Sequence, residues 1–202
     1  MRHFVIKHKE SGYLLASLSS LIWAGNYIIA RGLYQEVPPI TLAFFRWSSA
    51  TLIFLPFAWK YFKQDLPLLL RQGKYIFIVA LLGISLYNTL IYEAGRSVSA
   101  IEMALITTTT SPIFSLILAA FFLKERIRFI QLCGLLLCLL GILQLLTKGQ
   151  WENLIQFNFA QGSYWLVLAA LSFAVYNILV RKKPQGLSPY GFLWCLFGLG
   201  SL

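Results

Sequence analysis

The sequence predicts an all-α integral membrane protein built as a multi-span helical bundle, and two observations support this class. Hydrophobic residues make up 58% of the 202-residue chain and charged residues only 12%, about half the charge of a typical soluble domain. Apolar runs also recur, each close to the roughly 20 residues that a helix needs to cross a bilayer. The predicted spans are Gly12–Tyr34, Pro38–Trp59, Tyr75–Ala94, Ala100–Leu123, Ile127–Thr147 and Ser163–Val180, followed by a partial run from Pro189 to Leu202.

The positive charges, which give a net charge of +10, are unevenly shared between alternate connections. One set of connections holds Arg2, Lys7, Lys9, Lys60, Lys63, Arg71, Lys74, Lys124, Arg126, Arg128, Arg181, Lys182 and Lys183. The other set holds only Arg31, Arg96 and Lys148. Because loops rich in Lys and Arg stay in the cytoplasm, this distribution predicts a multi-pass protein of the cytoplasmic (inner) membrane with its N-terminus inside. The charge therefore indicates topology and no nucleic-acid partner, and it places Asp65 in a cytoplasmic loop.

An internal repeat relates the first span to the sixth. A shift of 150 residues aligns the region from Gly12 with the region from Gly162 without a gap. The identical pairs are Gly12/Gly162, Leu18/Leu168, Leu21/Leu171, Ala24/Ala174, Ile28/Ile178, Arg31/Arg181, Gln35/Gln185 and Pro39/Pro189. Because an odd number of spans separates the copies, the second copy enters the membrane from the opposite side, as in many secondary transporters. We expect one five-helix unit over residues 12–147 and the start of an inverted repeat over residues 162–202.

Two inverted five-helix units need ten helices, whereas this chain ends within its seventh apolar run. The run from Pro189 to Leu202 holds about 14 residues and rises roughly 21 Å as a straight helix, short of the ~30 Å hydrocarbon layer. The sequence therefore leads us to expect a truncated chain. Two functional hypotheses stay open: a solute carrier, and a non-transporting membrane remnant or partner subunit of a carrier.

Residues for covalent chemistry are scarce in the predicted spans. The histidines, His3 and His8, lie in the N-terminal tail, and the sequence has no Gly-rich phosphate loop. A Ser-His dyad, a His-ligated metal site and an ATP-driven pump each need one of these features. The sequence thus disfavours an intramembrane enzyme and predicts no catalytic residues, no metal and no cofactor.

Arg46 is the most informative charged residue, because it lies about eight residues into the second span. That places it roughly 12 Å from the end of the helix, about twice the distance over which a guanidinium can snorkel. A charge at this depth is costly and usually faces protein or a water-filled cavity. Two interpretations stay open: an anchor for an anionic group or a gating ion pair, and a structural salt bridge or carbonyl cap that fixes helix packing.

Polar and aromatic side chains inside the first and third spans are further candidates for substrate binding or gating. Asn26 lies at mid-depth and needs a hydrogen-bond partner there, and Trp23 lies too deep for an interfacial belt. In the third span, Asn88 and Tyr92 are four residues apart and share a helix face, next to Tyr87. Two roles fit each residue: lining a solute cavity, and bonding or packing between helices.

The fourth span carries the hydroxyl-rich run Thr107–Pro112 near its midpoint. Pro112 removes a backbone donor and strains the preceding turn, so we expect a loosened or kinked helix in which the Thr108 carbonyl loses its usual partner. Such a helix suits a solute site or a gate, because hydroxyls can satisfy freed backbone groups in a membrane. In the sixth span, Tyr176 and Asn177 lie near the repeat counterparts of the polar residues of the first span, and we add them to the candidates.

Two features belong to the predicted outer surface. Glu93 is expected to form a solvated ion pair with Arg96, three residues along the helix. The connection from Lys148 to Gln161 mixes aromatic and aliphatic residues, which suits a segment lying at the membrane interface.

A series of short motifs follows the order and spacing found in a known family. They are Ile22-Trp23-Ala24-Gly25-Asn26, Phe45-Arg46-Trp47, Leu86-Tyr87-Asn88 continuing to Ala100, Ala104–Leu146 with Ser111-Pro112, Lys124-Glu125-Arg126, Gly134 and Gly141, and Ala169–Arg181. Through these motifs nearly the whole chain resembles the EamA-type drug/metabolite transporter superfamily. Each motif is weak alone, and their order and spacing together give the resemblance its specificity.

The resemblance implies ten helices in two inverted units around a central cavity, with Asn26, Arg46, Tyr87, Asn88 and Pro112 near the cavity or its gates. It implies a secondary carrier that exports or exchanges small metabolites, amino acids or drugs. The expected partners are the lipid bilayer and a small-molecule solute. The sequence leaves the substrate, the coupling ion and a homo- or hetero-oligomeric state undetermined.

Overall fold

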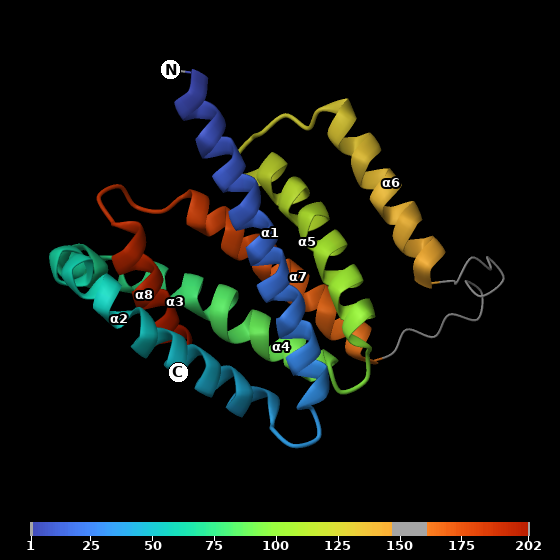
Figure 1. Ribbon diagram of the computed structural model, residues 1–202, viewed down its shortest axis with the longest axis horizontal. Helices are drawn as coiled ribbons and strands as arrows, with labels where there is room; N and C mark the ends of the chain where they lie inside the picture. The colour runs from blue at the N-terminus through green and yellow to red at the C-terminus, as the bar shows by residue number, and fades with distance from the viewer. Residues whose placement is uncertain (1, 147–160, 202) are drawn as a thin grey trace.

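The computed structural model describes residues 2–146 and 161–201. Within these ranges the regular structure is entirely helical, and Figure 1 shows a bundle with α6 at one edge. The elements are α1 (Arg2–Gly32), α2 (Pro39–Arg71), α3 (Gly73–Ala80), η1 (Leu81–Leu86), α4 (Tyr87–Ala94), α5 (Ala100–Phe122), α6 (Phe129–Leu146), α7 (Gln161–Arg181) and α8 (Pro189–Gly200). The helices α3 and α4 are joined without a break through η1, a stretch of π-helix.

Five helical segments in the described ranges are long and apolar enough to cross a membrane, which confirms an all-α, multi-span membrane protein. They are Gly12–Gly32, Pro39–Arg71, Gly73–Ala94, Ala100–Phe122 and Gln161–Arg181. Two shorter apolar helices, Phe129–Gly141 and Pro189–Gly200, come from α6 and α8. The predicted interfacial segment from Lys148 to Gln161 lies, apart from its last residue, outside the described residues.

The predicted second span ends at Trp59, but α2 continues without a break to Arg71. The placement of Asp65 in a loop is therefore wrong, because this residue lies on the helix and is buried. The physical reason is that the helical periodicity of buried residues continues through the segment that carries the charges. Ala58, Asp65 and Leu69 are seven and four residues apart and share one buried face. The lysines that suggested a loop lie on the exposed side of the same helix.

The buried carboxylate of Asp65 joins the end of α2 to the start of α8. Its Oδ2 accepts hydrogen bonds from the Ser188 backbone N–H over 2.9 Å and from the Ser188 hydroxyl over 2.5 Å. The Ser188 hydroxyl oxygen in turn accepts from the Gly191 N–H over 3.0 Å and caps the helix. A negative charge at a helix N-terminus is favourable because it offsets the helix dipole.

The helices α7 and α8 pack deep into the bundle. As Figure 1 shows, α7 lies against α4 and α5, and α8 lies along α2 and α3. By contrast, α1 makes fewer contacts, mainly with α5, and α6 packs chiefly against α5. Many leucine and isoleucine side chains, such as Ile53 and Leu137, remain on the outer surface. This is the surface expected of helices that face lipid.

The helices α1 and α7 run in opposite directions through the bundle. Arg31, near the end of α1, donates from Nη1 to the Gly95 carbonyl over 2.8 Å, and Gly162, at the start of α7, donates to Ser97 Oγ over 2.9 Å. Both contacts lie at the turn between α4 and α5. At the other end of α7, Arg181 forms a 3.0 Å ion pair with the glutamate that follows α5. Because the 23 residues of α5 rise about 34 Å, the repeat-related arginines lie at opposite ends of the bundle.

The hydroxyl-rich stretch of α5 differs in detail from the prediction. Pro112 lies inside α5 without interrupting it. The hydroxyls of Thr107 and Thr108 donate one turn back along the helix, to the carbonyls of Met103 over 2.7 Å and Ala104 over 2.6 Å. Both carbonyls precede that of Thr108, which is the carbonyl that Pro112 leaves without its usual helical partner. Neither hydroxyl therefore bonds to the freed carbonyl.

Candidate functional site

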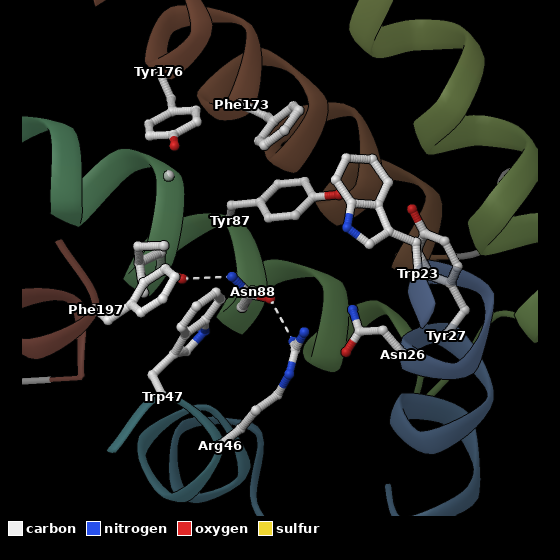
Figure 2. Close-up of a pocket in the computed structure, with 12 residues that line it drawn as sticks. Trp23, Asn26, Tyr27, Arg46, Trp47, Tyr87, Asn88, Phe173, Tyr176 and Phe197 are labelled. Atoms are coloured by element: carbon white, nitrogen blue, oxygen red, sulfur yellow. Dashed lines mark hydrogen bonds between the residues drawn. The ribbon is translucent and has the colours of Figure 1, made fainter. Parts of the chain in front are cut away.

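Arg46 on α2 is the centre of a hydrogen-bond network that links three helices, and Figure 2 shows its contact with Asn88. Its Nη1 donates to Asn88 Oδ1 over 2.9 Å and to the Tyr92 hydroxyl over 2.6 Å, both on α4. The Tyr92 hydroxyl donates in turn to Asn26 Oδ1 on α1 over 3.1 Å, and Asn88 Nδ2 donates to the Ile84 carbonyl over 2.8 Å. The polar residues predicted separately in three spans thus form one connected group.

The guanidinium of Arg46 has no carboxylate partner among the described residues, where the ion pairs lie at helix ends. Its Cζ instead lies over the Trp47 ring, 5.1 Å from the ring centroid, which is an attractive cation–π arrangement. Neutral hydrogen-bond partners reduce the cost of a charge in a membrane but leave the charge itself uncompensated. In the described part of the chain, Arg46 therefore forms neither a structural salt bridge nor a gating ion pair.

A cavity of about 200 Å³ lies beside this network. We call it the Arg46 cavity. Figure 2 shows that side chains from several helices surround it, with α1 on one side and α7 on another. It is lined by Trp23, Asn26, Tyr27, Arg46, Trp47, Gly83, Ile84, Tyr87, Asn88, Phe173, Tyr176 and Phe197.

A second cavity, of about 260 Å³, adjoins the first and is bounded by the hydroxyl-rich face of α5. We call it the threonine cavity. It is lined by Trp23, Tyr27, Tyr87, Thr107, Thr108, Ser111, Pro112, Ser115, Phe173 and Asn177. The two cavities meet at an aromatic wall, which consists of the four aromatic residues that line both: Trp23, Tyr27, Tyr87 and Phe173. Taken together, the two cavities have a volume that falls within the roughly 300–1,000 Å³ of ordinary small-molecule pockets.

Phe173 on α7 is the centre of the aromatic wall between the cavities. Its ring centroid lies 4.7 Å from that of Tyr87, 5.5 Å from that of Tyr176 and 6.0 Å from that of Trp23. The Tyr176 ring is stacked on it and the Trp23 ring meets it edge-on. Such pairs stabilise one another beyond simple burial, so the wall offers flat, ordered surfaces to an apolar solute.

The cavity-facing residues of α1 and α7 are repeat counterparts. Three positions on α1, and the positions 150 residues later on α7, all line one or both cavities. The pairs are Trp23/Phe173, Asn26/Tyr176 and Tyr27/Asn177. Positions i, i+3 and i+4 share one helix face, so equivalent faces of two antiparallel helices border the same space.

The π-helix η1 shapes the Arg46 cavity and was not predicted. A π-helix leaves some carbonyls free of their usual helical partners. The Leu82 carbonyl accepts from the Ser172 hydroxyl of α7 over 2.8 Å, and the Ile84 carbonyl accepts from Asn88. At Gly83 a side chain would overlap the Tyr176 ring. This stretch therefore brings α7 close and orients Asn88 toward Arg46.

Every predicted site residue except Tyr92 lines one of the two cavities, and Tyr92 takes part in the Arg46 network. Their roles in binding remain predictions. Among the lining residues that sequence reasoning missed are Phe173, Phe197, Gly83 and Ile84. A signal existed for Phe173, because it is the repeat counterpart of Trp23. The other three carry no polar group that distinguishes them from packing residues.

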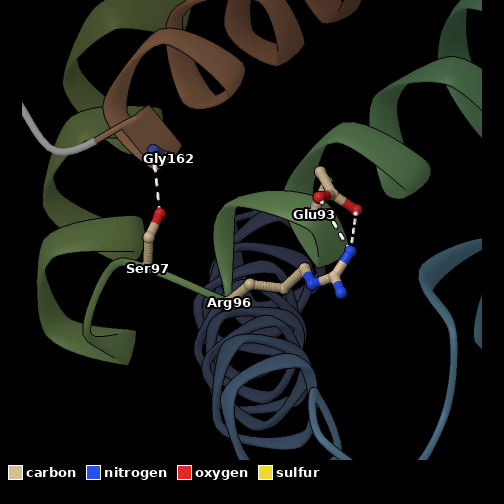
Figure 3. Close-up of polar contacts among 4 residues, drawn as sticks. All are labelled: Glu93, Arg96, Ser97 and Gly162. Carbon is tan, nitrogen blue, oxygen red and sulfur yellow. Dashed lines mark hydrogen bonds and ion pairs between the residues drawn. The ribbon is translucent and has the colours of Figure 1, made fainter.

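The predicted ion pair at the end of α4 is confirmed. Arg96 Nη1 lies 3.1 Å from Glu93 Oε1, and the side chains are 56% and 34% exposed, respectively. Figure 3 shows this pair beside the Ser97–Gly162 contact, at the end of the bundle where α7 begins. An exposed pair of this kind contributes about 0–1 kcal/mol, so it marks the helix end without forming part of either cavity.

A bundle of apolar helices around a polar and aromatic cavity, with a charged residue inside a membrane-spanning helix, is typical of multi-pass membrane transporters. The EamA-like transporter family model matches residues 10–147. The chain therefore belongs to the EamA-like transporter family, as its motifs predicted.

Curated relatives agree with this assignment. The chain is 30% identical over 188 residues to "Uncharacterized transporter YdfC" of Bacillus subtilis, covering 92% of this chain and 58% of the relative. It is 27% identical over 203 residues to "Uncharacterized transporter YxxF" of the same organism, covering 96% and 61%. It is 28% identical over 172 residues to an "S-adenosylmethionine uptake transporter" of Rickettsia bellii, covering 85% and 55%. The chain thus spans less than two thirds of these relatives. No solved structure matches it.

Proposed function

We propose that this chain acts in a secondary carrier that moves small metabolites, amino acids or drugs across the cytoplasmic membrane by alternating access. The observation that carries the proposal is that equivalent faces of α1 and α7 border the same cavities. Inverted repeats of this kind can exchange inward-open and outward-open arrangements around a fixed site. The residues proposed to bind the solute or gate its path are Trp23, Asn26, Arg46, Tyr87, Asn88, Tyr92, Thr108, Pro112, Tyr176 and Asn177.

The proposal includes the predicted organisation and topology. Residues 12–147 form the first five-helix unit, and residues 162–202 begin the inverted second unit. The N-terminus lies in the cytoplasm and the solute is exported. The opposite directions of α1 and α7, with Arg31 and Arg181 at opposite ends of the bundle, support the inverted arrangement.

A second candidate differs in the direction of transport. The name of the Rickettsia bellii relative describes uptake of S-adenosylmethionine. That solute carries a carboxylate, a positive sulfonium group and a flat adenine ring. A cavity with a free guanidinium and stacked aromatic rings suits the carboxylate and the ring. Uptake of a solute of this kind is therefore the alternative to export.

Counterflow into proteoliposomes containing the purified chain tests the carrier proposal. Vesicles are loaded with unlabelled solutes from a panel of amino acids and S-adenosylmethionine, and entry of the labelled solute is measured. We expect saturable counterflow for at least one solute, lost on Arg46→Ala and retained on Cys138→Ala, an exposed site on α6. Absence of counterflow throughout the panel would contradict the proposal and favour the non-transporting alternative.

Oriented membrane vesicles separate export from uptake. In energised inside-out vesicles, an exporter concentrates the solute identified by counterflow, whereas an uptake transporter concentrates it in right-side-out vesicles. Accumulation in the right-side-out preparation alone would replace export with the second candidate.

A further inference from the structure

Trp47 carries a buried N–H group without a partner. Its Nε1 is buried, and no hydrogen-bond acceptor reaches it within the described residues. Trp194 shows the usual state of a buried indole, because its Nε1 donates to the Thr51 carbonyl over 2.9 Å. Buried donors are nearly always satisfied by protein, water or ligand. Trp47 lines the Arg46 cavity, so an acceptor that enters the cavity can complete this N–H once the indole turns to uncover its Nε1.

Arg46 offers further donors on the same side of the cavity. Both of its hydrogen bonds within the described residues use Nη1, whereas a guanidinium has N–H donors on three nitrogens. Its Nε and Nη2 are thus available to another acceptor. Figure 2 shows the Arg46 guanidinium and the Trp47 indole next to each other below Asn88. A carboxylate, which has two acceptor oxygens, matches neighbouring donors of this kind.

The charge balance also favours an anionic group. Two described carboxylates are engaged elsewhere: Asp65 accepts from Ser188 at the start of α8, and Glu102 accepts from the Ser99 backbone N–H over 3.0 Å at the start of α5. None of the described carboxylates pairs with Arg46. An anion in the cavity would compensate a positive charge that lies within the apolar layer, where charge compensation matters most.

The remainder of the Arg46 cavity suits a flat apolar body. The rings of Tyr87, Phe173 and Tyr176 follow one another at centroid distances of 4.7 and 5.5 Å, with interplanar angles of 32° and 26°. Rings in such an arrangement present their faces and edges to an aromatic guest in the offset geometry that aromatic pairs prefer. These three rings lie across the cavity from Trp47 in Figure 2.

From these features we infer that the Arg46 cavity binds a monocarboxylate with a flat apolar or aromatic body. The carboxylate oxygens accept hydrogen bonds from Arg46 and from Trp47 Nε1, and the body lies against Tyr87, Phe173 and Tyr176. The inference names the substrate class of the proposed carrier and rests on that proposal. It also adds Trp47, whose indole N–H selects an acceptor, to the residues that determine specificity.

Equilibrium binding to the purified chain in dodecyl maltoside tests the inference. The probes are 3-phenylpropionate and 3-phenylpropanamide, which share a body and differ in the charge of the head group. We expect the carboxylate to bind at least about tenfold more tightly, since hydrogen bonds to charged groups are roughly twice as strong as neutral ones. Equal affinity for the two probes would overturn the inference.

Two variants with matched controls on α2 assign the preference to its residues. Trp47→Phe keeps an aromatic ring but removes the N–H together with part of the indole, and we expect about a three- to tenfold loss of carboxylate affinity with a smaller change in amide affinity. Arg46→Gln should remove the preference altogether. The controls are Trp59→Phe and Arg71→Gln, which lie outside the cavity lining. Unchanged carboxylate binding in the folded Trp47→Phe variant would contradict the role of the indole.

Competition distinguishes a carboxylate solute from a lipid head group, which also presents anionic oxygens. Glycerol 1-phosphate, added at the concentration of the probe, should leave 3-phenylpropionate bound. Its displacement would reassign the site to a phospholipid. Binding and transport are measured separately. If the chain shows counterflow but binds the two probes without preferring the carboxylate, only this inference is overturned. Carboxylate binding without counterflow of 3-phenylpropionate or of the panel would contradict the carrier proposal instead.

Discussion

The two repeat-related helices border the same cavities but are supported differently. Most of the inner face of α7 is buried between α4 and α5, including Leu166, Ala169, Ala170 and Ala174, none of which is exposed to any extent. The face of α1 is less covered, and Trp23 is 52% exposed. Segments with few buried contacts open most easily. The comparison indicates that α7 holds the cavity in place and that α1 is the helix better able to move.

Truncating the counterpart aromatic residues should reveal this difference most strongly. Phe173→Ala removes a ring that contacts Tyr87, Tyr176 and Trp23, so we expect a loss of about 2–4 kcal/mol in the free energy of unfolding. Trp23→Ala removes a half-exposed ring and should cost about 1 kcal/mol. Denaturant titration in mixed micelles measures both. Equal losses would mean that the two helices are equally well supported.

The first glycine pair of the repeat provides a sharper version of the same test. A Cβ at Gly162 would lie 2.7 Å from the Ala94 carbonyl oxygen and 2.5 Å from Ser97 Oγ, whereas a Cβ at Gly12 would meet nothing within 4 Å. Gly162→Ala should therefore destabilise the protein by about 1–3 kcal/mol. Gly12→Ala should be neutral or slightly stabilising, because alanine favours helix. Thermal unfolding of the two variants side by side gives the comparison, and a tolerated Gly162→Ala would refute the close contact at this end.

The half-buried amides of Asn26 and Asn177 should reverse the order of the two helices. Asn26 on α1 accepts a hydrogen bond from Tyr92, so Asn26→Ala should cost about 1 kcal/mol. Asn177 on α7 lines the threonine cavity and makes no hydrogen bond with the described residues, so Asn177→Ala should cost less than about 0.5 kcal/mol. The unfolding titration that measures the aromatic variants applies here. A larger effect at Asn177 would place an unrecognised structural contact on α7.

The smallest effect is expected at the far end of α7. Glu125→Gln breaks the ion pair with Arg181, in which both side chains are more than half exposed. Solvent screens such pairs, so we expect a change of at most about 0.5 kcal/mol in the free energy of unfolding. A loss several times larger, measured by the same titration at low and high salt, would show that this contact fixes α7.

Most of the fold could be predicted because the bilayer imposes a simple rule on sequence. Helices must be about 20 apolar residues long, and this rule located the spans to within a few residues. It failed at α2, where charges on one face hid an apolar face that continues through Ala58 and Leu69. It also gave no sign of η1, because a π-helix depends on contacts such as that from Ser172 to the Leu82 carbonyl.

The candidate site was predictable where polar residues stood out against an apolar background. Arg46, Asn26 and Asn88 were found in this way, and the repeat identified the region around Tyr176. Sequence reasoning missed Phe197, because an aromatic side chain in an apolar helix looks the same whether it lines a cavity or packs between helices. The sequence also could not reveal the unpartnered N–H of Trp47, because only the packing of neighbouring atoms leaves that group without an acceptor.

The account depends most directly on the opposite directions of α1 and α7 across the membrane. Single cysteines at the exposed positions Arg96→Cys and Lys182→Cys, introduced after replacement of Cys133, Cys138 and Cys195, can be reacted with a membrane-impermeant maleimide in intact spheroplasts. The account predicts labelling at Arg96→Cys and protection at Lys182→Cys until the membrane is opened. Labelling of both sites, or of neither, in intact spheroplasts would contradict it.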